Sequence, residues 1–133
     1  MSDENIEVVR KTIEAWNAGD MDRLQQFYDP DAVLRLYADA PEGGLPVVGR
    51  DNIMRVFGQM REAWDGTDTG EVLSDFLTVG DRVLVRVAWR GAGQGPAMAL
   101  EATLIYTVRS GLVFEIEFVR DHDAALEAVG LRE

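Results

Sequence analysis

The most constraining feature of this 133-residue sequence is a change in the spacing of its apolar residues near the middle of the chain. In the first half they recur every three to four residues, which is the period of an α-helix with one buried face. From about residue 71 onward they recur at every second residue, which is the period of a β-strand with one buried face. The order predicts an α+β domain, in which N-terminal helices cover one face of an antiparallel sheet.

Three helices are predicted in the first half. The first ends at Gly19, which can adopt a left-handed conformation. The second is short, is capped by Asp20 and stops at Asp29-Pro30. The third spans residues 50–64. The apolar faces of the three helices are, in order, Ile6, Val9, Ile13 and Trp16; Met21, Leu24, Phe27 and Tyr28; and Ile53, Val56, Phe57, Met60 and Trp64.

One strand is predicted between the second and third helices, and a run of strands follows the third. Gly80-Asp81 and Ser110-Gly111 have the composition of tight hairpin turns, and residues 91–96 form a longer turn. Sequential hairpins indicate an antiparallel, strongly twisted sheet. A short C-terminal helix is predicted over residues 121–131. The predicted strands are 32–37, 71–79, 82–90, 97–109 and 112–120.

Each later strand has one strongly apolar face, which we expect to lie under the helices. For the last three strands these faces are Val83, Val85, Val87 and Trp89; Met98, Leu100, Ala102, Leu104, Tyr106 and Val108; and Leu112, Phe114, Ile116 and Phe118.

The opposite face of the sheet is mixed. There Arg86 and Arg90 are available to pair with Glu115 and Glu117 across strands. The apolar residues on this outer face are Leu84, Ile105, Val113 and Val119. Since half-apolar sheet faces are often partner surfaces, we expect a homodimer through it; an ordinary solvated face is the alternative.

Composition excludes several classes of function. The chain has 24 acidic and 13 basic residues and a net charge of −11, which argues against nucleic acid and anionic membranes as partners. It has no cysteine and one histidine, which excludes thiolate and multi-histidine metal sites. No targeting or membrane-spanning segment is visible, so we expect a cytoplasmic protein. The length predicts one domain over residues 1–133, and the lack of metal-ligand clusters and nucleotide-binding motifs predicts no cofactor.

Several segments together resemble the SnoaL-like and ketosteroid-isomerase-like branch of the nuclear transport factor 2-like superfamily. They are residues 16–20 (Trp-Asn-Ala-Gly-Asp), 27–33, 48–57, 80–83 and 120–131. The resemblance implies a cone, in which the curved sheet wraps around the three helices and leaves an open apolar pocket for a small apolar molecule. The implied lining residues are Trp16, Leu34, Leu36, Phe57, Val85, Trp89, Leu100, Leu104, Ile116, Phe118 and Arg120.

The resemblance also allows the chemistry to be examined. Ketosteroid isomerases use a tyrosine and two aspartates, but the aligned positions hold Thr12, Leu36 and Leu104, so that mechanism is not expected. The resemblance to SnoaL-like cyclases implies a different chemistry, in which an aspartate, helped by a histidine, moves protons on a polyketide. Asp121 and His122 are the matching candidates.

Each of these candidate groups has a simpler reading. Asp121 can cap the tail helix and leave His122 in solvent. Tyr106 can donate a hydrogen bond to a ligand oxygen or to a protein group. Arg120 can bind a ligand carboxylate or form an ion pair with Asp39 or Asp121.

Two functions therefore stay open. One is a cofactor-free isomerase, cyclase or hydrolase that acts by acid–base chemistry on a small oxygenated molecule. The other is a non-catalytic module of the same fold that binds a small molecule or dimerises.

Overall fold

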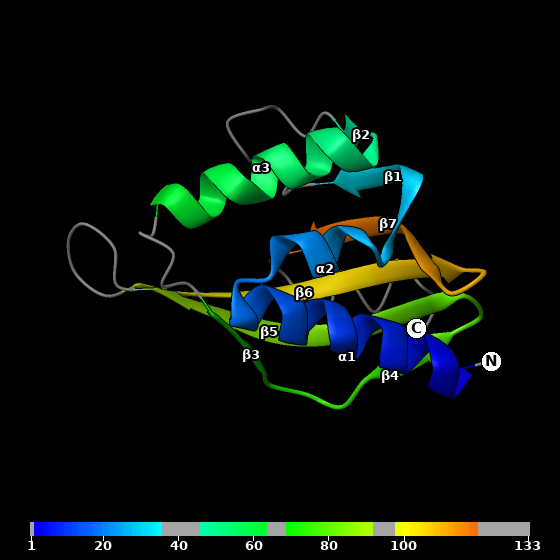
Figure 1. Cartoon of the computed structure of the whole chain (residues 1–133). Helices are drawn as coiled ribbons and strands as arrows, with labels where there is room; N and C mark the ends of the chain where they lie inside the picture. The colour runs from blue at the N-terminus through cyan, green and yellow to red at the C-terminus, as the bar shows by residue number, and fades with distance from the viewer. Residues whose placement is uncertain (1, 36–45, 64–68, 92–97, 120–133) are drawn as a thin grey trace.

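The structure of the chain is a computed structural model that describes residues 2–35, 46–63, 69–91 and 98–119 (Figure 1). Three helices pack on one side of a curved, unclosed sheet, as the spacing of the apolar residues predicts. The elements are α1 (Ser2–Ala18), α2 (Met21–Gln25), β1 (Tyr28–Arg35), β2 (Val47–Val48), α3 (Arg50–Ala63), β3 (Thr69–Val72), β4 (Leu77–Val79), β5 (Arg82–Gly91), β6 (Met98–Arg109) and β7 (Leu112–Val119).

The sheet has the strand order β2-β1-β7-β6-β5-β3, and β4 also pairs with β5. It curls from β1 and β2 beside α3 to β3 and β4 near α1 (Figure 1). Every strand pair is antiparallel except β1 with β7, which is parallel. The antiparallel pairing predicted from the hairpins is therefore confirmed for the strands that hairpins join, and β1 differs because no hairpin connects it to β7.

The start of β1 also differs from the prediction. Helix α2 ends at Gln25, and Tyr28 already lies in β1, where it pairs with Val113. Pro30 has no backbone N–H to donate, yet it does not end the strand. The β1–β7 register shifts between Tyr28 and Val33, so regular strand pairing is interrupted at Pro30 and no N–H is required there. The predicted start at Ala32 placed the strand boundary four residues too late.

The predicted end of the first helix and the predicted Ser110-Gly111 turn are confirmed by their backbone, whereas residues 92–96 of the longer predicted turn lie outside the described residues. Gly19 has φ 73°, and the N–H groups of Gly19 and Asp20 donate to the carbonyls of Trp16 and Ala15 at 3.0 Å each, which closes α1. Ser110 and Gly111 both have positive φ, 54° and 77°, as a two-residue type I′ hairpin turn requires. These turns set the direction of α2 and the β6–β7 pairing.

The inner faces predicted for the strands hold on β5 and β6 but fail at the start of β7. The register shifts between Thr107 and Val108, so that Phe114 is an extra residue in β7. Val113 consequently lies fully buried in the main core, whereas Phe114 is half-buried with the Arg109 guanidinium 4.7 Å from its ring centroid. The inward assignment of Leu112 and Phe114 is wrong, because one inserted residue reverses the alternation.

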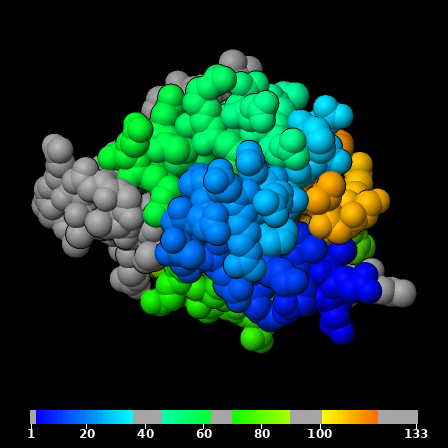
Figure 2. Space-filling view, viewed as in Figure 1, coloured from blue at the N-terminus to red at the C-terminus, as the bar shows by residue number. Residues whose placement is uncertain are grey.

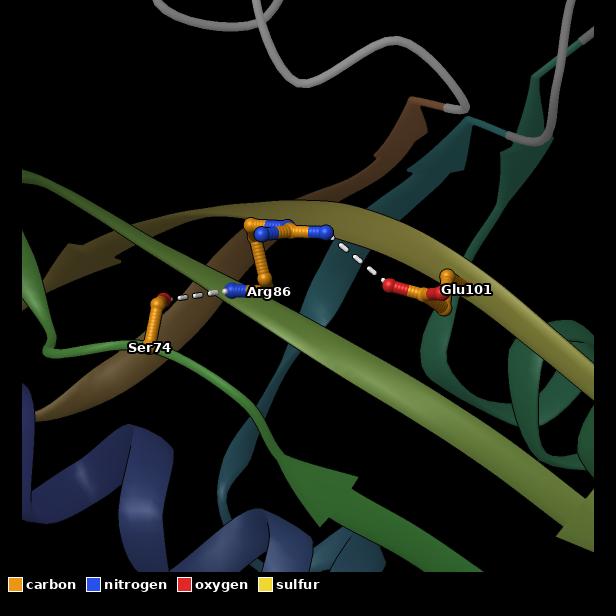
Figure 3. Close-up of polar contacts among 3 residues, drawn as sticks. All are labelled: Ser74, Arg86 and Glu101. Atoms are coloured by element: carbon orange, nitrogen blue, oxygen red, sulfur yellow. Dashed lines mark hydrogen bonds and ion pairs between the residues drawn. The ribbon is translucent and has the colours of Figure 1, made fainter.

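The outer face has different ion pairs from those predicted. Arg86 Nη2 lies 2.9 Å from Glu101 Oε1 on the neighbouring strand (Figure 3). Arg35 Nε lies 3.1 Å from Glu115 Oε2. A pair between Arg86 and Glu115 is not formed because β6 lies between β5 and β7. The side chain of Arg90 lies outside the described part of the chain.

The strand predicted over residues 71–79 is interrupted. Between β3 and β4 the backbone N–H of Arg86 donates to Ser74 Oγ at 3.0 Å, so that a side chain replaces a carbonyl in the ladder (Figure 3). Ser74 Oγ in turn donates to the carbonyl of Asp75 at 3.0 Å. The serine therefore keeps β5 hydrogen-bonded where its edge partner bends away.

The apolar residues predicted on the outer face are not open to solvent. Leu84 and Ile105 are 1% and 4% exposed in the single chain and form a small second cluster with Val119. The fourth residue, Val113, lies in the main core. The homodimer therefore stays a prediction, but it no longer rests on exposed apolar residues. The molecular mass from sedimentation at micromolar concentration tests it, since one chain and two chains differ twofold in mass.

The helical side forms one continuous surface, with α1 and α2 in blue against α3 in green (Figure 2). Residues 36–45 and the helix predicted over residues 121–131 lie outside the described residues. Among the described helices, none is long and apolar enough to cross a membrane.

Candidate ligand-binding site

The residues predicted to line a pocket gather in the main core. Seven of them are buried there, and Trp89 packs against them. Leu36 and Arg120 lie outside the described residues, as do the catalytic candidates Asp121 and His122, and the side chain of Leu100 is not described either. The seven buried residues are Trp16, Leu34, Phe57, Val85, Leu104, Ile116 and Phe118.

Four aromatic side chains from four elements meet at the end of α1. The Trp16 ring contacts Phe57 and Trp89 edge to face, with ring centroids 5.5 Å and 5.7 Å apart. Trp89 in turn stacks on Phe118 at 6.3 Å. The cluster therefore connects α1, α3, β5 and β7 through aromatic contacts, in which ring edges and faces of opposite partial charge attract each other.

Two polar groups of this aromatic cluster have no partner. The indole N–H groups of Trp16 and Trp89 are both shielded from solvent, and neither finds an acceptor among the described residues. An unpaired buried donor costs about 1–3 kcal/mol, and native proteins contain only a few such groups. Two such donors therefore lie on adjacent rings of this cluster.

The position of the Trp89 ring depends on a glycine. Gly70 faces Trp89 across the β3–β5 ladder. A Cβ atom at position 70 would lie 2.8 Å from Trp89 Cζ3 and 3.1 Å from Val87 Cγ1. The absence of a side chain at Gly70 is what allows the indole to pack this close to the edge strand.

Asn17 ties the end of α1 to the same glycine. Its Nδ2 donates to the Gly70 carbonyl at 2.9 Å, and the Gly70 N–H donates to its Oδ1 at 2.7 Å. The asparagine side chain thus makes the same pair of hydrogen bonds that a neighbouring strand would make.

Arg61 of α3 holds the other tryptophan. Its Nη1 donates to the Trp16 carbonyl at 2.9 Å, and its guanidinium carbon lies 5.0 Å from the Trp16 ring centroid. This is a cation–π contact, which fixes the face of the indole that points toward α3. Together Asn17, Gly70 and Arg61 position both indoles.

Sequence reasoning missed these three supporting residues. Asn17 entered the sequence analysis only through the segment that carries the family resemblance, and Gly70 and Arg61 carry no pattern of their own. Asn17 and Gly70 are 53 positions apart. No local signal reports a contact over that separation.

A second group of polar side chains lies deeper in the core. Thr12, Tyr28 and Tyr106 are 2–3% exposed. Thr12 Oγ1 donates to the Val9 carbonyl at 2.6 Å and is also hydrogen-bonded to the Tyr106 phenol. The predicted role of Tyr106 as a hydrogen-bond donor to a ligand stays a prediction.

Burial dominates the titration of both tyrosines. It raises the pKa of Tyr106 well above the ordinary value, and the hydrogen bond from Thr12 lowers it only in part. Burial likewise raises the pKa of Tyr28, and the neighbouring Tyr106 raises it further. Both phenols are therefore neutral at physiological pH.

The interior carries hydroxyl and indole groups and no ionised ones, as far as the described residues show. Every described aspartate and glutamate is at least partly exposed. Within the same residues, no three acidic or histidine side chains come together as metal ligands. What the described core can supply to a bound molecule is apolar surface and neutral hydrogen-bond donors.

The family follows from comparison of the sequence with family models. The SnoaL-like domain model matches residues 9–116, which include all of the described core except Phe118. The chain belongs to the SnoaL-like domain family. The resemblance inferred from the sequence segments is thereby confirmed.

Solved structures with the nuclear transport factor 2-like, or cystatin-like, fold superpose on this SnoaL-like domain. Bal32a, from a soil-derived mobile gene cassette, has a TM-score of 0.80 at 22% identity, with 96% of each chain covered. TerC, co-crystallised with polyporic acid, has a TM-score of 0.74 at 20% identity, with 95% of this chain and 97% of TerC covered.

A third structure is a provisionally assigned polyketide cyclase from Sinorhizobium meliloti. It has a TM-score of 0.70 at 25% identity, with 84% of this domain and 93% of that chain covered. No curated protein is significantly similar in sequence. The comparisons thus define the fold and family of this SnoaL-like domain and no specific activity.

Proposed function

We propose that this SnoaL-like domain binds a small, largely apolar molecule whose oxygen atoms accept hydrogen bonds from Trp16 and Trp89. The observation that carries the proposal is the pair of shielded indole N–H groups without an acceptor among the described residues. A ligand oxygen placed there removes the cost of the unpaired donors.

The surroundings of the two indoles favour a flat, unsaturated ligand. Phe57 and Phe118 complete the aromatic cluster, and no described carboxylate is buried beside it. Aromatic rings pack well against such a cluster, face to face or edge to face. The co-crystallisation of TerC with polyporic acid and the provisional assignment of the Sinorhizobium meliloti protein as a polyketide cyclase support the same chemical class.

A matched pair of ligands tests the binding function. Fluorene and fluorenone are planar tricycles of nearly the same size, and only fluorenone carries a carbonyl acceptor. Equilibrium dialysis should show fluorenone bound about tenfold more tightly, which corresponds to about 1.4 kcal/mol, within the range of a buried donor that gains its partner. Equal affinity for the two tricycles would contradict the proposal.

Phenylalanine substitutions locate the donors. Trp16→Phe and Trp89→Phe keep an aromatic ring and remove the N–H. The double variant should reduce the preference for fluorenone over fluorene toward unity, while the affinity for fluorene changes little, and the single variants show which donor the one carbonyl uses. A preference that survives in the double variant would place the carbonyl elsewhere in the molecule.

For catalysis we propose acid–base isomerisation, cyclisation or hydrolysis, with Asp121 and His122 as the proton-transferring pair. Support comes from family membership and from the adjacent aspartate and histidine that directly follow residue 120 in the sequence. Turnover of aromatic β-diketones, followed by absorbance, should fall in both Asp121→Asn and His122→Ala while fluorenone binding is kept.

Non-catalytic binding is the second candidate. It is favoured by the absence of any buried acidic side chain among the described residues, because the described core then holds no group that would accept a proton at neutral pH. Fluorenone binding without turnover of any β-diketone would select this function.

A further inference from the structure

We infer that Asn17 is a positioning residue that sets the spacing of the Trp16 and Trp89 donors and so selects ligands with two oxygen acceptors. The inference rests on the proposed binding function and specifies its ligand: a flat molecule with two carbonyl oxygens on one edge, rather than a single carbonyl.

The first step is the contact that Asn17 makes. Its amide both donates to and accepts from the Gly70 backbone, at 2.9 Å and 2.7 Å. A pair of opposed hydrogen bonds fixes the orientation of the two backbones as well as their separation, which a single bond does not. The C-terminal end of α1 is therefore held in register with β3.

The second step connects this contact to both indoles. Trp16 is the residue before Asn17 in the chain, so its backbone shares the anchored segment. Trp89 lies on the other side, since its ring occupies the place where a Gly70 side chain would be, with Cζ3 2.8 Å from that point. A shift of α1 along β3 would thus change the distance between the two indoles directly.

The third step concerns rigidity. Arg61 donates to the Trp16 carbonyl and lies over the Trp16 ring, while Trp89 stacks on Phe118. Each indole therefore packs against a further element, α3 for Trp16 and β7 for Trp89. The Asn17–Gly70 contact fixes the position of α1 relative to β3. Donors held in place before binding lose little entropy when a ligand pairs with both of them.

The fourth step is the chemical consequence. The two shielded donors without described acceptors lie on rings whose centroids are 5.7 Å apart, a separation similar to the width of one small aromatic molecule. A ligand with one carbonyl pairs with one donor and leaves the other unpaired. A ligand with two carbonyls pairs with both, so that its advantage depends on the spacing that Asn17 maintains.

Two probes differ by one carbonyl. N-methyl-1,8-naphthalimide has two carbonyls flanking one nitrogen, and the corresponding N-methyl lactam keeps the same six-membered ring on naphthalene but has a methylene group in place of one carbonyl. Equilibrium dialysis of the full chain should show the imide bound about tenfold more tightly, the ratio expected for one additional buried donor that is paired.

The variants are Asn17→Ala, Asn17→Asp and the matched control Asn52→Ala. Asn52 also donates from Nδ2 to a backbone carbonyl, that of Val48, at 2.9 Å, but on the first turn of α3. Asn17→Ala should reduce the imide-to-lactam ratio from about ten to between one and three, because the second donor is no longer held in place. Asn17→Asp keeps an acceptor for the Gly70 N–H and should give an intermediate ratio, and Asn52→Ala should leave the ratio unchanged.

A spectroscopic measurement reports the indole pair without a ligand. Two close, inclined indoles should give an exciton couplet in the far-ultraviolet circular dichroism spectrum. The couplet should weaken in Asn17→Ala and persist in Asn52→Ala. Since Asn17→Asp retains half of the contact, it supplies the same comparison if the alanine variant does not fold.

The outcomes separate the inference from the function on which it rests. If the wild-type chain prefers fluorenone to fluorene but binds imide and lactam equally, the two-acceptor specificity is wrong and the binding function stands. If the imide preference and the couplet are both unchanged in Asn17→Ala, Asn17 does not position the indoles. If fluorenone has no advantage over fluorene, the binding function itself fails.

Discussion

Replacing Gly70 by alanine tests how closely the edge strand and Trp89 are fitted. The added Cβ atom would lie 2.8 Å and 3.2 Å from two carbon atoms of the Trp89 ring and 3.1 Å from Val87 Cγ1. The ordinary separation of such carbon atoms is about 3.5–4.0 Å, so the ring or β3 must move by several tenths of an ångström. Such overpacking typically costs about 1–3 kcal/mol.

The assay compares Gly70→Ala with a second glycine-to-alanine change. Gly58 lies within α3, has no atom within 4 Å of an added Cβ and does not have a positive φ. Gly58→Ala should therefore raise the free energy of unfolding by about 0.5–1 kcal/mol, since alanine favours the helix. Urea unfolding followed by circular dichroism should thus move in opposite directions for the two variants.

A double variant identifies the cause of the Gly70→Ala effect. Trp89→Phe removes the part of the indole ring that the new Cβ would meet. The double variant should then be less destabilised than the sum of the single changes, with a coupling of about 0.5–3 kcal/mol. Equal stability of Gly70→Ala and Gly58→Ala, or strict additivity in the double variant, would refute the close fit between Gly70 and Trp89.

Three further changes test other parts of the fold. Tyr106→Phe should make stability less sensitive to alkali. Burial raises the pKa of Tyr106, so the native state keeps a proton that the unfolded state loses from about pH 10 upward. In urea titrations the wild type should therefore lose up to about 1.4 kcal/mol more of its free energy of unfolding per pH unit than the variant. Ser74→Ala removes the acceptor of the Arg86 N–H and should cost about 1 kcal/mol; an unchanged unfolding midpoint would show that water replaces it. Gly111→Ala forces a side chain into φ 77° and should cost about 1–2 kcal/mol, measured by thermal unfolding, whereas no loss would mean that the type I′ turn changes its conformation.

The fold was largely predictable because its signals are local. The apolar face of α1 and the inner face of β5 follow from spacing alone, and the turn at Ser110-Gly111 follows from its composition. The errors lie where a non-local contact overrides the local pattern. Pro30 lies within β1 because pairing with β7 is interrupted there, and Val113 is buried because one extra residue reverses the alternation of β7.

The candidate site was predictable only in its apolar part. Trp16 and Trp89 were both expected in the pocket because they lie on inward faces of α1 and β5. That their N–H groups are unpaired depends on which acceptors the folded chain brings near, and spacing does not report this. The supporting residues Asn17 and Gly70 are visible only once two distant segments are side by side.

The parallel pairing of β1 with β7 has a consequence for how the chain acquires its structure during synthesis. Arg35 and Glu115, which form an ion pair across these strands, are 80 residues apart. While the polypeptide is made from its N-terminus, β1 therefore leaves the ribosome long before its sheet partner exists. Contacts of such separation form slowly, so the half-sheet at β1 and β2 would spend that interval with an open hydrogen-bonding edge. The helices, whose contacts are local, can form first. The pairing of β7 with β1, which completes the sheet, would then be a late event in folding.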